Sequence, residues 1–136
     1  MFKITSKTID TQEAIQFAES GNSGAVSVFI GTVRNNTQGK KVVSLEYEAY
    51  EAMAVKKMED IAYEARQKWP IEKIAIIHRI GKLSIGETAV VVAVSTPHRK
   101  EAFEACQFLI DTLKKVVPIW KKEIYEDGEV WVAAHA

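Results

Sequence analysis

The stretch with the clearest chemical potential is residues 114–123, Lys-Lys-Val-Val-Pro-Ile-Trp-Lys-Lys-Glu, which places four lysines around one proline. The whole chain carries 18 basic and 18 acidic residues, so this cluster is a local excess of positive charge. A solvated helix end tolerates lysines, but Pro118 forces the backbone out of a helix, and the chain beyond it must restart as an extended segment. The stretch therefore predicts a turn lined with cations, which suits an anionic ligand.

Two lysines of this stretch can do more than bind an anion. In a strand that begins at Ile119, Lys121 alternates with Lys122, so only one of the two points toward the protein body. An ammonium that is partly desolvated among other cations loses its proton more readily, which makes it competent as an acid, base or nucleophile. We therefore predict that Lys114 and Lys121 carry chemistry. The alternative for Lys114 is a solvated last helical turn, where cations complement exposed carbonyls.

A second basic group, His98-Arg99, follows Thr96 and Pro97, which are typical of an N-cap and a first helical position. With Thr96 as the cap, His98 and Arg99 take the second and third positions, where a capping box would place Glu or Gln. Free N–H groups and the helix dipole attract anions there, and the arginine adds a rigid fork. The sequence predicts a phosphate cradle that forms one anionic site with the lysines; two solvated side chains are the alternative.

Other reactive residue types give weaker signals. Arg34 follows an apolar strand and can supply a third cation, with Thr32 adding hydrogen bonds. Cys106 lies on the apolar row of a predicted helix, among Phe103, Leu109 and Ile110, so its thiol is expected to be an inert part of the core. His78 lies in a predicted strand and His135 near the terminus, and the chain holds a single cysteine, so no metal site is predicted.

Composition limits the class of protein. At 136 residues, with 47% hydrophobic and 26% charged residues, the chain predicts one folded domain over residues 1–136. Its balanced charge argues against the broad positive surface that holds nucleic acid. No segment approaches the roughly 20 apolar residues of a membrane span. A single cysteine excludes an internal disulfide. From these features together we expect a cytoplasmic protein that binds neither membrane nor nucleic acid.

Hydrophobic periodicity predicts alternating strands and helices. Strands are expected over residues 2–7, 24–33, 42–50, 71–80, 88–95, 119–125 and 129–134, and helices over 11–20, 51–68 and 97–117. The β-branched run at 90–94 predicts a central strand covered on both faces. A hairpin is expected to join 24–33 to 42–50 around the polar loop between them, and Asp127-Gly128 predicts a C-terminal hairpin.

Three blocks of this sequence resemble the catalytic subunit of molybdopterin synthase, and they follow one another over nearly the whole chain. They are Phe29-Ile30-Gly31-Thr32-Val33-Arg34, Ser95-Thr96-Pro97-His98-Arg99, and Lys114 through Pro118-Ile119-Trp120-Lys121-Lys122-Glu123. The most specific element is the last block combined with the His-Arg pair. A departure is His135, which stands where other members can carry arginine. The resemblance implies an α+β fold of the α/β hammerhead type, with a mixed or antiparallel sheet, three main helices and the C-terminal hairpin.

The resemblance also implies a sulfurtransferase of molybdenum cofactor biosynthesis that needs no cofactor of its own. Two sulfurs would pass from the C-terminal Gly-Gly thiocarboxylate of a small ubiquitin-like carrier subunit to cyclic pyranopterin monophosphate, giving molybdopterin. The implied assembly is a homodimer that binds two carriers as a heterotetramer. The core position expected for Cys106 agrees with this, because the sulfur must then come from a partner.

Carried over to this sequence, the resemblance implies that Lys114 and Lys121 are catalytic, or that either forms a transient covalent link to the carrier. The implied substrate-binding residues are Thr32, Val33, Arg34, His98, Arg99, Lys114, Lys121, Lys122 and Glu123. It further implies that His98 and Arg99 serve the lysines of the opposite subunit. The alternative function is a noncatalytic dimeric module that binds a phosphorylated metabolite or an acidic peptide tail through the same cations; a nucleic-acid module is less well supported.

Overall fold

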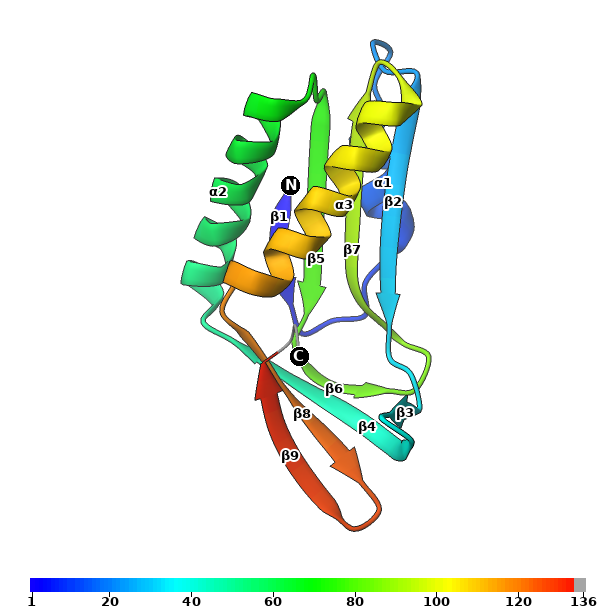
Figure 1. Ribbon diagram of the computed structural model, residues 1–136, viewed down its shortest axis with the longest axis vertical. Coiled ribbons are helices and arrows are strands. Elements are labelled where there is room, and N and C mark those ends of the chain that lie inside the picture. Colours follow the sequence, from blue (N-terminus) through cyan, green and yellow to red (C-terminus); the bar gives the residue numbers. More distant parts are fainter. Residues whose placement is uncertain (134–136) are drawn as a thin grey trace.

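The computed structural model describes residues 1–133, and His135 of the C-terminal tail lies outside this range. Within the range, three helices and nine strands follow one another along the chain (Figure 1). In order, they are β1 (Phe2–Thr5), α1 (Thr11–Ala18), β2 (Ala25–Thr32), β3 (Asn36–Thr37), β4 (Lys40–Ala49), α2 (Glu51–Lys68), β5 (Lys73–Arg79), β6 (Gly81–Ser84), β7 (Thr88–Thr96), α3 (Arg99–Val116), β8 (Ile119–Tyr125) and β9 (Gly128–Ala133).

The first sheet has the strand order β1-β5-β7-β2, with β1 parallel to β5 and the other pairs antiparallel. Helices α2 and α3 cover one face, and α1 covers the other (Figure 1). Strand β7 lies between two neighbours and is buried from Ala89 to Thr96, because its β-branched side chains meet helices on both sides. The predicted central strand is therefore confirmed.

The second sheet runs across one end of the first, with the order β3-β4-β8-β9 and β6 paired to β4 (Figure 1). Strands β8 and β9 form the predicted C-terminal hairpin around Glu126 and Asp127. The expected hairpin between 24–33 and 42–50 is wrong, because β2 pairs with β7 whereas β4 pairs with β8 and β6. The reversal encoded by the polar loop is the shorter β3–β4 hairpin, whose turn residues Gln38 and Gly39 both have positive φ.

The core fills both sides of the first sheet. The larger cluster joins α2, α3 and the inner face of the second sheet through residues such as Met58, Leu109 and Leu45, and the smaller lies under α1 around Ala14. The amphipathic pattern predicted for α3 is confirmed except at Phe103, which was expected on the apolar row. Its side chain is 64% exposed. It follows the buried Ala102 by about 100° of helical rotation, which turns it away from the sheet.

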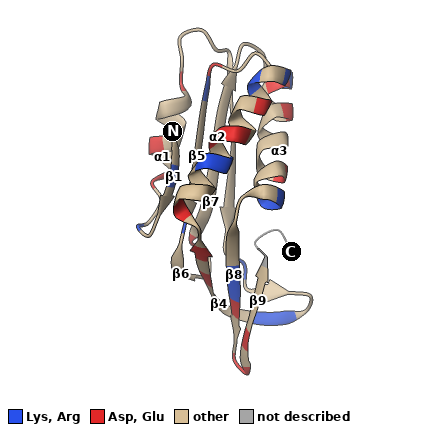
Figure 2. Cartoon of the chain, turned by 90° about the vertical axis from the view of Figure 1, so that its left-hand side faces the viewer, with Lys and Arg blue, Asp and Glu red and all other residues tan. Residues whose placement is uncertain are grey.

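Charged residues of both signs are interspersed over the side of the molecule seen in Figure 2, on α2, α3 and the β8–β9 hairpin alike. Among residues 1–133, no helix has both the length and the apolar character needed to cross a bilayer. The observed elements confirm the expected α+β class with three helices and a C-terminal hairpin.

The two faces of α3 give a paired test of this packing. Leu109→Ala should lower the free energy of unfolding by about 2–5 kcal/mol, because Leu109 is fully buried and its truncation leaves a cavity. Phe103→Ala should cost less than about 1 kcal/mol. Urea unfolding followed by circular dichroism measures both. Equal losses in the two variants would show that the orientation of α3 is wrong.

Candidate active site

A cavity of about 350 Å³ lies where the C-terminal end of α3 meets both sheets. It is lined by the following residues: Gly31, Thr32, Arg34, Thr37, Leu45, Tyr47, His78, Ala89, Val90, Leu113, Lys114, Lys121 and Glu123. Three of the basic residues predicted to bind an anion, Arg34, Lys114 and Lys121, are thus brought together from the segment after β2, from α3 and from β8. Thr32 and Glu123, also among the predicted site residues, line the same cavity.

The pairing of β8 with β4 decides which lysine faces the cavity. Lys121 lies directly opposite Tyr47, and Glu123 directly opposite Leu45, so these four side chains share one face of the second sheet. Lys122 points to the other face, where its ammonium lies 3.3 Å from a Glu46 carboxylate oxygen. The predicted alternation is confirmed, and it leaves Lys122 outside the cavity.

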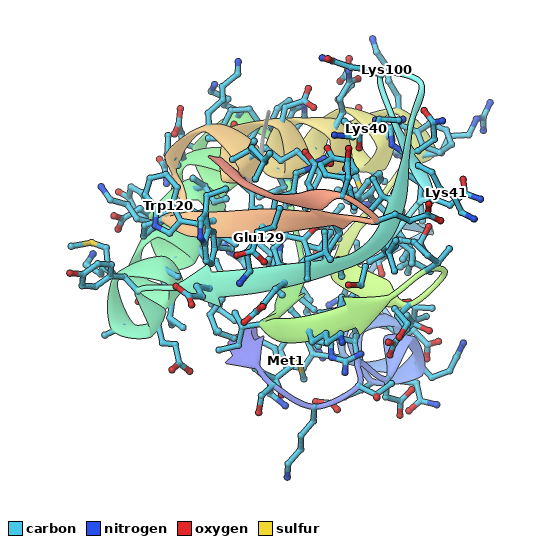
Figure 3. The ribbon with its side chains drawn as sticks, turned by 90° about the horizontal axis from the view of Figure 1, so that it is seen from below. Met1, Lys40, Lys41, Lys100, Trp120 and Glu129 are labelled. Atoms are coloured by element: carbon cyan, nitrogen blue, oxygen red, sulfur yellow. The ribbon has the colours of Figure 1, made fainter. Side chains whose placement is uncertain are left out.

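Lys122 belongs to a cluster on the outer face of the second sheet. Its ammonium also lies 3.8 Å from Glu129 and 5.1 Å from the centre of the Trp131 ring. Figure 3 views the molecule from below, with Glu129 and Trp120 labelled along the β8–β9 hairpin. The contacts of Lys122 in the isolated chain therefore stabilise the hairpin that carries Lys121.

Lys121 has the electrostatic surroundings expected of a reactive lysine. Its side chain is half-buried, and burial is the main cause that lowers its pKa; the charges of Lys114 and Arg34 lower it further. Glu123 opposes this shift because a carboxylate favours the ammonium form. Lys114 lies at the mouth of the cavity, where its side chain is exposed in the isolated chain. The arrangement gives one desolvated and one solvated cation side by side.

Glu123 is the buried negative charge of this group of residues. It is only 5% exposed, and the hydroxyl of Thr37 donates a hydrogen bond to its carboxylate at 2.5 Å. A buried carboxylate is costly unless it is hydrogen-bonded and near positive charge, and here Thr37 and Lys121 meet both conditions. Glu123 therefore holds β3 against β8 and offsets part of the cavity's positive charge.

Two uncharged polar rings, Tyr47 and His78, also line the cavity, and sequence reasoning missed both. Their centroids lie 5.0 Å apart at an interplanar angle of 73°. Burial raises the pKa of Tyr47 to about 12, with a further contribution from Glu123. Burial likewise lowers the pKa of His78 to about 4, so both rings are neutral at neutral pH. Strand alternation offered a signal, because it puts His78 on the same face of β5 as the core residues Ile74 and Ile76.

His98 and Arg99 lie at the other end of α3, so within one chain they do not line the cavity that holds the lysines, and their predicted share in one anionic site stays a prediction. An 18-residue helix spans about 27 Å, and in Figure 3 Lys100, in its first turn, lies far across the view from Trp120, which follows the helix in β8. The predicted cap is also corrected. His98, with φ −128° and ψ 153°, is the N-cap. The hydroxyl of Thr96 donates a hydrogen bond to the His98 carbonyl instead of accepting one from a helical N–H.

Val33, a predicted site residue, and Cys106, a predicted core residue, both lie in the packed interior. Val33 is buried beside the cavity, where its N–H donates to the carbonyl of Glu87 at 2.9 Å. Cys106 is 5% exposed and burial raises the pKa of its thiol, so its predicted place in the core is confirmed. Among residues 1–133, no three His, Cys, Asp or Glu side chains gather closely enough to hold a metal ion.

The titration of His78 predicts a pH dependence of stability. Its pKa is about 4 in the folded protein against 6.5 ordinarily, so the unfolded chain binds more protons between these values. Stability from this group is complete above pH 6.5 and is lost as the pH falls toward 4. Between pH 7 and 4.5 the wild type should lose on the order of 2 kcal/mol more than His78→Gln, measured by urea unfolding. Parallel losses would contradict the neutral, buried state of His78.

Known proteins have sequences and folds similar to those of this chain. A family model described as MoaE protein matches residues 4–116. The molybdopterin synthase catalytic subunit of Bacillus subtilis is 54% identical over 131 residues, which cover 96% of this chain and 83% of the relative. The human subunit of the same name is 47% identical over 131 residues, covering 96% of this chain and 70% of the relative.

Solved structures agree with these sequence relatives. Molybdopterin synthase from Staphylococcus aureus superposes with a TM-score of 0.93 at 48% identity, covering 96% of each chain. A chain of the complex of subunits 1 and 2 of the molybdopterin-converting factor from Helicobacter pylori superposes with a TM-score of 0.78 at 25% identity, covering 96% of this chain and 88% of that one. The expected fold is thus confirmed, and this chain belongs to the MoaE family, the catalytic subunits of molybdopterin synthase, an enzyme of molybdenum cofactor biosynthesis.

Proposed function

We propose that this protein transfers two sulfurs to cyclic pyranopterin monophosphate, taking them from the C-terminal thiocarboxylate of a small ubiquitin-like carrier subunit. The observation that carries the proposal is the half-buried Lys121 in a cavity of about 350 Å³, with Lys114 and Arg34 beside it. Both substrates end in an anionic group, a phosphate on the pterin and a thiocarboxylate on the carrier. A cavity lined by three cations suits ligands of this kind.

The two lysines have complementary roles in the proposed reaction. Lys121, whose pKa is lowered by burial, can give and take a proton as sulfur adds to the pterin. Lys114, at the cavity mouth, stabilises the negative charge that develops on the reacting groups. Thr32, Arg34 and Glu123 contact or orient the substrates from the cavity wall. Val33 acts through its backbone and Lys122 through its ion pairs, which hold β8 in place.

The proposed sulfur donor is a partner protein, because the thiol of Cys106 is buried in the core. The Helicobacter pylori structure described as a complex of two subunits supports a small partner for this chain as well. We extend the proposal to a homodimer that binds two carriers through their Gly-Gly ends, in the cytoplasm, where thiols and thiocarboxylates stay reduced. In that assembly, His98 and Arg99 of one subunit would complete the anion site of the other.

The lysine variants test this function. Lys121→Ala and Lys114→Ala should each reduce the formation of molybdopterin at least about 100-fold, because each removes a charge or proton carrier aimed at the transition state. Carrier binding should change by less than a few-fold. The assay mixes purified protein, thiocarboxylated carrier and cyclic pyranopterin monophosphate, and follows the pterin by mass for the gain of two sulfurs.

Lys115→Ala is the matched control for these variants, because Lys115 is exposed in the same helical turn and does not line the cavity. It should keep the wild-type rate within about twofold. Wild-type rates in both Lys114→Ala and Lys121→Ala would refute the roles assigned to them. Binding of carrier and pterin by the wild type without any sulfur gain would indicate a noncatalytic binding module.

The origin of the sulfur is tested by Cys106→Ser. The variant should transfer sulfur at a rate within a few-fold of the wild type, because the buried thiol takes no part in the reaction. Folding is checked by its circular dichroism spectrum and thermal melting curve. A folded variant without activity would show that Cys106 carries sulfur and that the partner alone does not supply it.

A further inference from the structure

His78 has an acceptor nitrogen that the described part of the chain leaves unengaged. The ring is 4% exposed and lines the cavity beside Tyr47. Its Nδ1 lies 2.8 Å from the carbonyl oxygen of Arg79. A carbonyl only accepts hydrogen bonds, so Nδ1 must carry the proton, and in the neutral ring Nε2 then carries a lone pair. Within residues 1–133, no hydrogen bond engages Nε2.

Nε2 is not among the fully buried side-chain atoms without a partner, which in residues 1–133 are Arg79 Nε and Glu101 Oε2, so it keeps accessible surface in a ring that lines the cavity and can meet a ligand there. A lone pair repels the oxygen or sulfur of an anion, so the anionic end of a ligand is excluded from this position. An N–H or O–H group is attracted instead. Leu45, Ala89 and Val90 line the same cavity, and an apolar wall strengthens a hydrogen bond that is made beside it.

The cavity therefore has two chemically different ends. Arg34, Lys114 and Lys121 offer positive charge, whereas Tyr47 and His78 offer neutral hydrogen-bonding groups. The depressed pKa of His78 keeps this second end uncharged throughout the neutral range. A ligand that carries an anionic group and, a few bonds away, a neutral donor satisfies both ends at once.

We infer that His78 is a specificity-determining contact, which accepts a hydrogen bond from a neutral N–H or O–H donor of a ligand whose anionic end lies among Arg34, Lys114 and Lys121. This inference rests on the proposed function, which supplies two ligands with that chemistry. One is the pterin, with its ring N–H groups and phosphate. The other is the carrier's C-terminal tail, with its glycine amides and thiocarboxylate.

The experiment measures binding in two separate arms for the wild type and three variants of His78. In one arm the probe is cyclic pyranopterin monophosphate, and in the other it is the carrier subunit with an ordinary C-terminal carboxylate; both are followed by calorimetry. His78→Phe keeps a ring against Tyr47 but removes the acceptor. His78→Gln reaches roughly as far as Nε2 and restores an acceptor oxygen, whereas His78→Asn reaches only as far as Nδ1.

His78→Phe and His78→Asn should weaken binding of one probe by roughly 5- to 50-fold, because its donor is left unpaired in a buried place. His78→Gln should recover binding to within about threefold of the wild type. The arm that responds identifies the ligand, and the other arm serves as its control for folding. The Gln and Asn pair keeps the test decisive if the Phe variant does not fold.

Unchanged affinity for both probes in folded His78→Asn would overturn the inference while leaving the proposed function intact. Equal weakening in His78→Gln and His78→Asn would also overturn it, because the side chain would then matter for packing alone. Failure of the wild type to bind either probe would refute the proposed function and, with it, this contact. These outcomes need no turnover, so the two failures are distinguishable.

Discussion

The register between β4 and β8 is the constraint on which the site depends. It places Lys121 opposite Tyr47 and Glu123 opposite Leu45, and it therefore turns this lysine and this carboxylate toward the cavity. Because side chains alternate along a strand, a slip of one residue would turn Lys122 inward and Lys121 outward. The pairs of Lys122 with Glu46 and Glu129, together with the Trp131 ring, hold the register from the outer face.

Within this register, the cavity tolerates three neighbouring cations because its other polar groups are arranged around them. Glu123 is the buried counter-charge, held in turn by the hydroxyl of Thr37. Tyr47 and His78 remain neutral because they are buried, so they add hydrogen-bonding capacity without adding charge. The desolvation that lowers the pKa of Lys121 thus depends on the packing of the two sheets against each other. No single helix or strand produces it.

The features predicted well from the sequence are those fixed by local rules. The apolar periodicity of 51–68, the β-branched run of β7 and the Asp127-Gly128 turn each specify one structure within a few residues, and each is confirmed. The β2–β4 hairpin was wrong because strand partners depend on distant segments, which a loop composition does not report. His98 and Arg99 are a different case. The length of α3 separates them from Lys114 within one chain, so a site that they share with the lysines requires a second copy of the chain, as the resemblance implies.

Different parts of the site follow from different features of the sequence. The cations and the alternation of Lys121 with Lys122 follow from local rules, whereas the expected substrates and partner follow from the family resemblance. His78 and Tyr47 follow from neither, because a lone histidine or tyrosine in a strand is usually a core residue. Their significance depends on the cavity they share with Lys114 and Lys121, which exists only in the folded chain.

The most direct test of this account is the pKa of the Lys121 ammonium, measured by NMR titration of protein carrying isotope-labelled lysine, with Lys121→Arg to assign the signal. The account predicts a pKa below the ordinary value of 10.5, and a rise toward that value in Lys114→Ala, which removes a neighbouring positive charge. A pKa at or above 10.5 in the wild type would contradict it, because Lys121 would then be neither desolvated nor held among cations.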